Sequence, residues 1–501
     1  MNKLVCFLSP PSRSFNHYRP PVALMYLAGY LEKNGYASEI VDIIYQQQVR
    51  DEKFLKNKKK ILHQTERKII KEVRRLKPDI VGITCYTPEY FEVLDLAKAT
   101  KKINPKIKIV VGGVHPTFYP EHFCYRGSPF DAVVIGEGEV TMLELTRALR
   151  QKTSLRKITG LAFLDQKGKR VVTPKRNLVQ DLDSLSFPAY DKIDMDYYTT
   201  ANPYAIRGVF LRSIYVLYSR GCPSQCTFCV AKKLRTCNGR GNYVRLRQPK
   251  KIFEEILRLK EKYKIDSFYF IDDLFTLNKK KVKEFCQLLI RADLNLLWGC
   301  SSKVTTVDYQ TLKWMKKSGC VQIDFGVERG SNEALRQVKK GITIEIIKRV
   351  FRDCHRLGIR TFANMLVNIP KETEKDLEDI VKLLKEIQPT IVAINTFTPY
   401  PGTEIFEQHS RRFTKKDYPL MMKDPGWLTK KYPRKFRFAR HQIDFQSWAG
   451  DYYKKFNQVI PNLKIYISRQ YLSLLFHSKN KFDYLKQFHL LLKEFINQKF
   501  G

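Results

Sequence analysis

Two series of short apolar runs, alternating with helix-length segments, constrain the fold of this 501-residue chain more than any other feature. The runs of the first series are KLVCFL, SEIVDI, DIVGITC, KIKIVVGG and DAVVIGEGE. Helical patterns accompany them at 22–34, 51–76, 89–103 and 140–151. Because strands that alternate with helices form parallel sheets covered on both faces, residues 1–152 are predicted to form a doubly wound α/β domain.

The second series begins at Ser213 and contains six strand candidates: SIYVLYS, DSFYFID, NLLWGCS, VQIDFGV, RTFANMLV and IVAINTFT. Six successive strand–helix units predict a partial (β/α)6 barrel over residues 205–408, with its functional face at the carboxyl ends of the strands. Residues 153–204 are predicted to be a connector, with an irregular linker at DLDSLSFPAYDKID. Residues 409–501 are predicted to be a basic, aromatic and mostly helical cap, with helices at 451–475 and 481–498.

Composition excludes several classes of protein. A hydrophobic fraction of 43% with 12% aromatic residues excludes an intrinsically disordered chain. No apolar run approaches the ~18 residues of a membrane span, and the apolar stretch at the N-terminus is too short for a signal peptide. The eleven cysteines are an odd number scattered from Cys6 to Cys354, unlike a secreted disulfide framework. We therefore expect a cytoplasmic protein with reduced thiols.

The formal net charge of +40 raises the question of anionic partners. Clustered lysine and arginine bind nucleic-acid backbones, but here the excess is spread along the chain on predicted helix faces. Solvated lysines explain most of it, and the diffuse pattern argues against specific nucleic-acid binding. Phosphate-bearing substrates and contact with an anionic membrane surface stay open. The excess is densest at residues 411–501, where 20 Lys and Arg face 6 Asp and Glu.

Three cysteines crowd the loop after the first predicted barrel strand, at Cys222, Cys226 and Cys229. A zinc site normally needs four protein ligands, or three and a water, and no further cysteine or histidine pair lies at zinc-finger spacing. Iron–sulfur clusters, in contrast, are held by closely spaced thiolates on one loop. Three thiolates hold three irons of a cubane cluster and leave the fourth iron open to a ligand.

This CxxxCxxC spacing, with Phe228 directly before the third cysteine, resembles the signature of the radical S-adenosylmethionine superfamily, whose catalytic domain is a partial TIM-like barrel. The resemblance implies a [4Fe-4S] cluster whose open iron is chelated by the amino and carboxylate groups of S-adenosylmethionine. It also implies reductive cleavage of the sulfonium to methionine and a 5′-deoxyadenosyl radical, which removes hydrogen from unactivated carbon. Phe228 is carried over as a cofactor-binding residue.

Other barrel segments are similar to this superfamily. FYFIDDLFTLN places Asp272 and Asp273 at the end of the second predicted strand, where the family sets polar groups near the methionine moiety. Glu328, in a segment similar to the family's GxExGS, is a candidate for binding the ribose hydroxyls. TPYPGTEIF resembles the segment that closes the sixth unit. For these three carboxylates the alternative of solvated groups at strand ends stays open.

One barrel segment departs from the family pattern. The usual GLPGET is here NIPKET, so Asn368 and Lys371 stand where the family has glycines. The departure leaves open whether this segment contacts S-adenosylmethionine, but it does not affect the predicted cluster.

The first series of strands resembles the cobalamin-binding domain that one large subfamily carries upstream of its barrel. The resemblance depends on IVGITCYTPEYFEVLDLAK, KIVVGGVHPTFYPE and VVIGEGE, and it implies a Rossmann-like sheet of the cobalamin-binding type. Gly112 and Gly113 allow backbone to approach a bulky ligand after a strand, and Thr84 offers a hydroxyl to a nucleotide tail. The alternative is a docking module that binds no corrinoid.

The cobalamin motif DxHxxG is absent after the first strand. In SPPSRSFNHYRPP, His17 has neither an aspartate two places before it nor a glycine three places after it. We therefore expect base-off cobalamin whose cobalt has no ligand from this motif. His115, after the glycine pair, is a weaker candidate for a substitute.

Four other cysteines suggest alternatives. Cys6, Cys85 and Cys124 invite comparison with tRNA methylthiotransferases, whose N-terminal domain supplies three thiolates to a second cluster. However, Cys6 and Cys85 lie in predicted buried strands and the surrounding motifs are missing, so these three cysteines are interpreted as small buried hydrophobes. Cys237, eight residues after the cluster motif, keeps a covalent or proton-transfer role as an alternative to a structural one.

The sequence thus predicts a cobalamin-dependent radical S-adenosylmethionine enzyme that methylates an inert carbon, although no catalytic residue can be named. Relatives also perform ring formation, oxygen insertion and rearrangement, so these reactions stay open. The substrate is expected to be a small molecule, lipid or peptide, and the electron donor a flavodoxin or ferredoxin. A different class, an RNA-modifying enzyme or RNA-binding protein that uses the basic surface, is the alternative.

Overall fold

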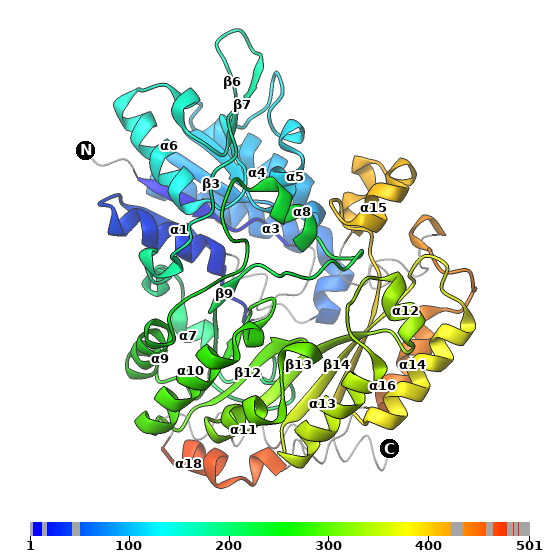
Figure 1. Ribbon diagram of the computed structural model, residues 1–501. Helices are drawn as coiled ribbons and strands as arrows, with labels where there is room; N and C mark the ends of the chain where they lie inside the picture. Colours follow the sequence, from blue (N-terminus) through cyan, green and yellow to red (C-terminus); the bar gives the residue numbers. More distant parts are fainter. Residues whose placement is uncertain are drawn as a thin grey trace.

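The computed structural model describes residues 4–12, 18–42, 51–421, 434–456 and 464–477, together with Tyr484 and His489. Two α/β bodies lie one above the other, the N-terminal one in blue and cyan and the barrel in green and yellow (Figure 1). Each is built on its own sheet, of seven and six strands respectively. The predicted fold class, a doubly wound sheet followed by a partial barrel, is confirmed.

The N-terminal sheet has the strand order β2-β1-β3-β4-β5-β6-β7. Its strands are β1 (Val5–Leu8), β2 (Ser38–Val41), β3 (Ile80–Thr84), β4 (Lys108–Gly112), β5 (Ala132–Val134), β6 (Leu161–Leu164) and β7 (Arg170–Val172). The helices with it are α1 (Val22–Lys33), α3 (Asp51–Leu76), α4 (Tyr90–Ile103), α5 (Val114–Phe118) and α6 (Glu139–Gln151). Strands β1 to β5 are parallel, and separate apolar cores form on the two faces of the sheet.

The connector contributes more than the sequence predicted. Its residues form β6 and β7, an antiparallel pair that extends the sheet beyond β5. With four and three residues, these strands are too short for a periodic pattern to reveal them. Around residues 181–194 the chain has only short 3-10 turns, as expected for an irregular linker.

The barrel sheet has the strand order β15-β14-β13-β12-β11-β8, and its neighbouring strands are parallel. Its strands are β8 (Ser213–Val216), β11 (Ser267–Phe270), β12 (Leu297–Ser302), β13 (Cys320–Glu328), β14 (Arg360–Val367) and β15 (Ile391–Thr396). The longer helices between them are α9 (Pro249–Tyr263), α10 (Lys279–Ala292), α11 (Tyr309–Lys317), α13 (Ile344–Arg356) and α14 (Glu374–Ile387). Because β8 and β15 are edges, the barrel is open, as predicted.

Shorter elements decorate the carboxyl end of this sheet. They are β9 (Ser219–Arg220), α8 (Ala231–Cys237), β10 (Arg245–Leu246), α12 (Asn332–Gln337) and α15 (Glu404–His409). Strands β9 and β10 form a separate antiparallel ribbon. The cysteine loop lies between β9 and α8, beyond the first barrel strand.

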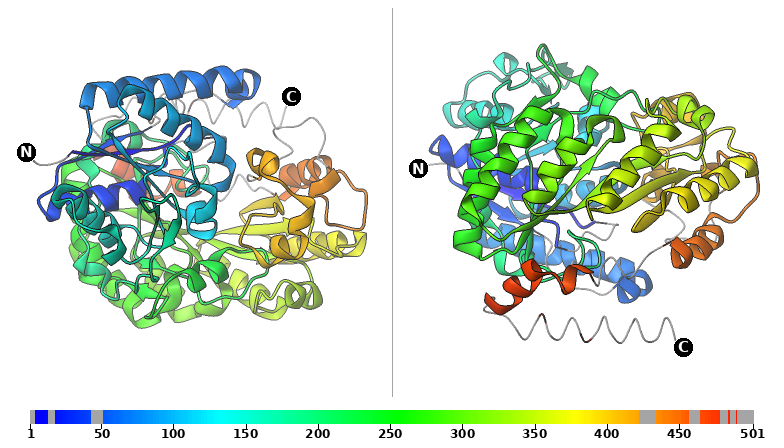
Figure 2. Two further views of the ribbon diagram at one scale, coloured as in Figure 1. Left: turned by 90° about the horizontal axis from the view of Figure 1, so that it is seen from above. Right: turned by 60° about the horizontal axis from the view of Figure 1, so that its bottom comes forward.

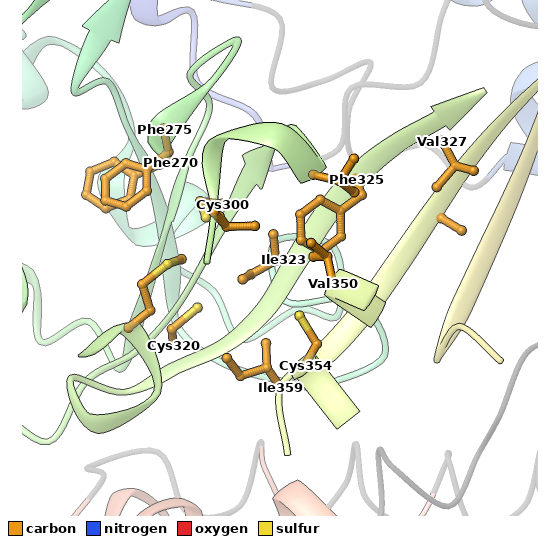
Figure 3. Close-up of a cluster of buried hydrophobic side chains, with 14 of the residues drawn as sticks. Phe270, Phe275, Cys300, Cys320, Ile323, Phe325, Val327, Val350, Cys354 and Ile359 are labelled. Atoms are coloured by element: carbon orange, nitrogen blue, oxygen red, sulfur yellow. The ribbon is translucent and has the colours of Figure 1, made fainter. Parts of the chain in front are cut away.

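The barrel core is apolar and contains thiols as well as rings. Phe268, Phe270, Phe275 and Trp298 pack against one another at ring-centroid distances of 4.3–6.0 Å. Cys300, Cys320 and Cys354 lie among isoleucine, valine and phenylalanine side chains (Figure 3). These three thiols are fully buried and behave as small apolar groups.

The C-terminal region corrects one prediction. The expected continuous helix at 451–475 is divided: α16 (Phe445–Phe456) and α18 (Arg469–His477) are separate, and residues 464–466 form a helical turn of their own. A turn at Ile467–Ser468 precedes α18, where the Ser468 hydroxyl accepts a hydrogen bond from the Tyr471 N–H. Pro461, in the sequence between the helices, is incompatible with the interior of a straight helix. The predicted helix at 481–498 falls almost wholly outside the described residues.

None of the described helices combines the length and apolarity needed to span a bilayer.

Candidate functional site

A cavity of about 780 Å³ lies between the N-terminal domain and the barrel. The N-terminal domain lines it with residues at and after the ends of its parallel strands, including Thr84, Gly112, Gly113, Gly136 and Gly138. The barrel lines it with residues that follow β8 and β11, including Ser219, Arg220, Gly221 and Asp273. The carboxyl ends of both parallel sheets, where α/β folds bind ligands, therefore face one space.

The cysteine loop reaches the edge of this cavity through Gly221. This glycine has a φ of +91°, and a Cβ there would lie 2.3 Å from the Tyr243 carbonyl oxygen. Only glycine therefore fits where the chain leaves the β9–β10 ribbon. The next residue is Cys222, and Cys226 and Cys229 follow on the same loop, with Cys226 buried and the other two half-buried.

The donor set of this loop fits a cluster better than a single ion. Within the described ranges, no group of three His, Cys, Asp or Glu side chains lies close enough to hold one metal ion. A cubane cluster bonds each thiolate to a different iron, so its cysteines stand farther apart than the ligands of one ion. Cys222, Cys226 and Cys229 thus fit a [4Fe-4S] cluster, although these ligand roles stay predictions.

The charges around the loop agree with that assignment. Burial raises the pKa of the Cys226 thiol, with Lys340 and Lys303 opposing it, and raises the pKa of Cys229 to about 11. Thiolates at such positions need a neighbouring positive charge, which iron supplies when bound. The two lysines place further positive charge beside the thiols.

Asp272 holds the backbone that leads into the cysteine loop, and Arg235 holds the loop itself. The Asp272 carboxylate is buried and accepts hydrogen bonds from the backbone N–H groups of Tyr218, at 3.1 Å, and Ser219. Burial outweighs these hydrogen bonds and raises its pKa to about 7. On the other side, the Arg235 guanidinium donates to the carbonyl oxygen of Cys222 at 3.1 Å. Sequence reasoning placed Asp272 near the cofactor but did not predict this anchoring contact.

Asp273, in contrast, is exposed and lines the cavity. The structure therefore separates two neighbouring carboxylates that the sequence could not distinguish. A direct contact with cofactor stays a prediction for both.

The side chains of Phe228 and Glu328 both lie near the Lys340 ammonium group. Glu328 ends β13 with a φ of +68°, and its Oε1 lies 2.8 Å from the Lys340 Nζ. The same Nζ lies 5.8 Å from the centroid of the Phe228 ring. The predicted cluster-loop aromatic and the predicted ribose ligand are thus close in space. Contact of Glu328 with ribose stays a prediction, since Lys340 is its partner here.

The NIPKET segment keeps the backbone conformation of a glycine-containing segment. Asn368 and Lys371 both have a φ of +69°. The fully buried Asn368 side chain accepts from the Phe438 N–H at 2.8 Å and donates to the Phe436 carbonyl oxygen at 2.8 Å. The departure from the family pattern therefore attaches the C-terminal segment to the end of β14. Nothing in the local sequence indicated this long-range contact.

Gly113 is required for a reason that the sequence did not give. Its φ is +109°, and a Cβ would lie 2.9 Å from the Cys85 carbonyl oxygen and 3.1 Å from the Thr84 Oγ1. The glycine therefore lets the loop after β4 lie directly against the end of β3. A Cβ on Gly112 would make only ordinary contact with Val134, at 3.5 Å. Together the two glycines leave their part of the wall free of side chains, which fits a flat macrocycle.

The described residues that line the cavity include no histidine. His115 is fully buried, with its Nδ1 2.9 Å from the Thr87 hydroxyl and its Nε2 3.2 Å from the His122 Nδ1. Burial and the neighbouring His122 lower the pKa of His115 to about 3. Both ring nitrogens therefore have partners inside the domain, so His115 is not placed to bind cobalt. His17 lies outside the described residues.

A buried ion-pair bridge joins the two domains beside the cavity. Arg220 and Arg245 stand opposite each other in the β9–β10 ribbon. Arg245 donates two hydrogen bonds to Glu137, at 2.9 and 2.6 Å, and Arg220 donates to Glu139 at 2.6 Å. The side chains of Arg245 and Glu139 are only 3% and 6% exposed. Burial raises the pKa of Glu139, but Arg220 outweighs it, so that pKa is lowered.

This bridge ties the N-terminal domain to the cluster loop, because Cys222 follows Arg220 by two residues. The VVIGEGE segment gave no local indication of a role for its two glutamates. The repeated Gly-Glu pair was the available signal, but the arginine partners lie 81 and 108 residues away in the chain.

The remaining cysteines agree with their structural interpretation. Cys6, Cys85 and Cys124 are buried and unbridged, and burial raises the pKa of Cys6 to about 12. Cys237 ends α8 half-buried, and burial raises its thiol pKa as well. It does not line the cavity, so the geometry favours its structural role.

Comparisons with known proteins agree with this geometry. The family model for the B12 binding domain matches residues 12–146, and the model for the radical SAM superfamily matches residues 216–384. An uncharacterized methyltransferase of Pyrococcus horikoshii is 34% identical over 68% of this chain and 71% of its own length. An anaerobic magnesium-protoporphyrin IX monomethyl ester cyclase of Rubrivivax gelatinosus is 31% identical over 78% of this chain and 66% of its own length.

Among solved structures, the chain resembles the radical S-adenosylmethionine methyltransferase TsrM of Kitasatospora setae, solved with cobalamin and a [4Fe-4S] cluster bound. The TM-score is 0.64 at 19% identity, covering 82% of this chain and 78% of that one. At this identity the likeness concerns the fold.

Proposed function

Because this chain belongs to the radical S-adenosylmethionine enzymes that carry a B12-binding domain, we propose that it transfers a methyl group to an inert carbon of its substrate. Its cofactors are a [4Fe-4S] cluster, S-adenosylmethionine and cobalamin. When bound, the cluster and S-adenosylmethionine supply a hydrogen-abstracting radical and the corrinoid supplies the methyl group. The Pyrococcus horikoshii relative is itself named a methyltransferase.

The observation that carries the proposal is the single cavity lined from both sides. Gly112, Gly113 and Thr84 line it on the B12-binding side, and Gly221, next to Cys222, lines it on the barrel side. A substrate carbon in this space can therefore lie between the two cofactors. The chain contributes by holding the cluster loop through Asp272 and Arg235 and by fixing the two sides through the Glu139–Arg220 pair.

Ring closure is the second candidate, because the Rubrivivax gelatinosus relative is named a cyclase. The two reactions differ in the origin of the carbon in the product. Product formed with S-adenosylmethionine labelled at its methyl group should carry the label if the enzyme is a methyltransferase. A cyclised product without the label would overturn methyl transfer.

The substrate class is proposed to be a small molecule, lipid or peptide, and the reductant a flavodoxin or ferredoxin. We place the enzyme in the cytoplasm.

Because the basic charge is diffuse, binding to bulk tRNA should be weak and sequence-indifferent at physiological salt. A nanomolar, sequence-selective RNA complex at that salt would favour the RNA-modifying alternative.

The state of the bound corrinoid tests the proposal before a substrate is known. Anaerobic reconstitution with hydroxocobalamin should give roughly one corrinoid per chain, bound base-off without a protein imidazole. Electron paramagnetic resonance of the cob(II)alamin state should lack nitrogen splitting, and His17→Ala should leave the spectrum unchanged. A nitrogen-split signal lost in His17→Ala would contradict the ligation, whereas failure to retain corrinoid would reduce the domain to a docking module.

A further inference from the structure

The two most exposed large apolar side chains in the described part of the chain, Ile467 and Phe476, lie at the C-terminal helix α18, and exposed Leu472 lies between them in the sequence. Ile467 is 73% exposed, Phe476 is 66% exposed and Leu472 is 40% exposed. Leu472 and Phe476 are four residues apart and so share a face of the helix, and Ile467 lies in the turn before it. Apolar surface of this kind on a soluble domain marks a contact site more often than a single exposed residue does.

The opposite side of the same segment is firmly attached to the barrel. Tyr466, Tyr471 and Leu474 are buried against residues of β8, β11 and β12. The Tyr471 hydroxyl donates to the Phe210 carbonyl oxygen at 3.2 Å, and the Gln470 side chain donates to the Leu296 carbonyl oxygen at 3.3 Å. The orientation of α18 is therefore fixed, and its apolar residues point outward because the other face is already used.

The barrel end around α18 is basic. Helices that connect parallel strands return antiparallel to them, so α9, α10, α11 and α13 end where the strands begin, next to α18. Six exposed bases lie at the ends of these helices: Lys262, Lys264, Arg291, Lys316, Lys317 and Arg356. Two more, Lys464 and Arg469, come from the C-terminal region. The exposed acidic residues in the same helix ends are Glu261 and Asp293. Exposed bases therefore outnumber exposed acids at these helix ends, on the side of the barrel where α18 is attached.

We propose that this end of the barrel binds the surface of an anionic lipid membrane. Ile467, Leu472 and Phe476 insert among the headgroups, while the surrounding lysines and arginines face the anionic lipids. A few protruding apolar side chains in a basic surround suit a lipid interface, because a stable protein interface needs a broader complementary area. Nucleic acid is a poorer match, since it offers the three outward apolar side chains no apolar environment.

The proposed contact leaves the active cavity free. Contacts to Phe210 and Leu296 place α18 at the amino ends of the barrel strands, whereas the cavity lies at their carboxyl ends. Figure 1 shows α18 below the barrel, on the side opposite the N-terminal sheet, and Figure 2 shows the same helix from the underside. Membrane binding should therefore not depend on the corrinoid or on S-adenosylmethionine, and it stands or falls separately from the proposed reaction.

Co-sedimentation of the reconstituted full-length enzyme with vesicles tests the proposal. The enzyme should bind vesicles of phosphatidylcholine mixed with phosphatidylglycerol, bind pure phosphatidylcholine weakly, and be released as salt is raised. The double variant Ile467→Ser, Phe476→Ser should bind the anionic vesicles at least about tenfold more weakly, because both apolar anchors are removed. Its unfolding midpoint and S-adenosylmethionine cleavage should stay at the wild-type level, since neither residue contacts the cavity.

Val172→Ser provides the matched control, because Val172 is 54% exposed on β7 of the other domain. It should leave vesicle binding unchanged. Equal binding to both vesicle types, no binding to either, or unchanged binding of the double variant would each overturn the proposal. Salt-sensitive tRNA binding without vesicle binding would overturn it also, and would assign the basic end to nucleic acid.

Discussion

The two sides of the active cavity are built by different means. On the N-terminal side the wall includes glycines at the strand ends, with Gly112 ending β4, Gly113 directly after it and Gly136 after β5. On the barrel side three cysteine side chains stand on one loop; Arg235 donates to its backbone, and Asp272 holds the backbone that leads into it. One side thus suits the predicted corrinoid by its shape, and the other presents the three thiols that are predicted to bind iron.

This difference affects how each side tolerates change. Loss of a thiolate removes a bond that no neighbour replaces, whereas a change in the glycine wall acts through steric fit and is graded. An ion-pair bridge connects the two sides and consists of Glu137, Glu139, Arg220 and Arg245. A substitution in this bridge should therefore affect both sides, but less than a substitution in either side itself.

The largest effect is expected on the cluster side. Replacing Cys222, Cys226 and Cys229 together by Ala should lower the iron content from about four atoms per chain to nearly none and abolish S-adenosylmethionine cleavage. Cys237→Ala, eight residues further on, should retain both. Iron analysis and detection of 5′-deoxyadenosine after anaerobic reduction measure these outcomes. Full cleavage by the triple variant would remove the basis of the assignment.

On the corrinoid side, Gly113→Val should weaken cobalamin binding by more than about tenfold, because the added Cβ meets the Cys85 backbone and strains the loop after β4. Gly35→Val is the matched control, since Gly35 also has a positive φ, of +80°, but nothing lies within 4 Å of its Cβ position. It should share the backbone strain and keep the corrinoid. Equal loss of corrinoid in the two variants would show that general strain, and not the wall at Gly113, is responsible.

A smaller effect is expected at the bridge. Glu139→Gln leaves the buried Arg220 guanidinium with only the Glu137 carboxylate, at 3.6 Å, and should destabilise the ribbon by about 3 kcal/mol or less. Amide hydrogens of Ser219 and Arg220 should then exchange faster, and a chelator should remove iron sooner. Asp165→Asn, which breaks the exposed pair with Arg156, should change neither rate. Unchanged exchange in Glu139→Gln would mean that the two sides are positioned independently.

The smallest expected effect is a pH dependence confined to the N-terminal side. Because the pKa of His115 is lowered to about 3 when folded, the folded domain binds fewer protons than the unfolded chain between about pH 3 and 6.5. His115 should therefore contribute a decline in stability of about 1.4 kcal/mol for each pH unit below 6.5, and His122, whose pKa burial lowers to about 4, should add to that decline. His115→Gln should flatten this decline between pH 6.5 and 5, as measured by thermal unfolding. An unchanged slope in the variant would assign the acid sensitivity to other groups.

Local patterns determined much of this protein from sequence alone. The apolar runs predicted as strands form strands in the structure, both around Val5, Ile80 and Lys108 and from Ser213 onward. They could be predicted because the alternation of short apolar runs with amphipathic helices is set by neighbouring residues. The same holds for Cys222, Cys226 and Cys229, which lie on one loop because their spacing is short. Ligand spacing and strand periodicity are properties of a few consecutive residues.

Contacts between distant residues were decided only by the tertiary structure. The attachment of Asn368 to the backbone of Phe438 spans 70 residues and has no local signature. The bridge from Glu139 to Arg220 also joins distant residues without a local signature. The apolar face of α18 points outward because Tyr471 and Leu474, on its other face, pack against strands far earlier in the chain. Even Gly113, singled out from sequence, proved to be needed for packing against Cys85. A sequence pattern can show that a residue is unusual, but only the folded chain decides which group it meets.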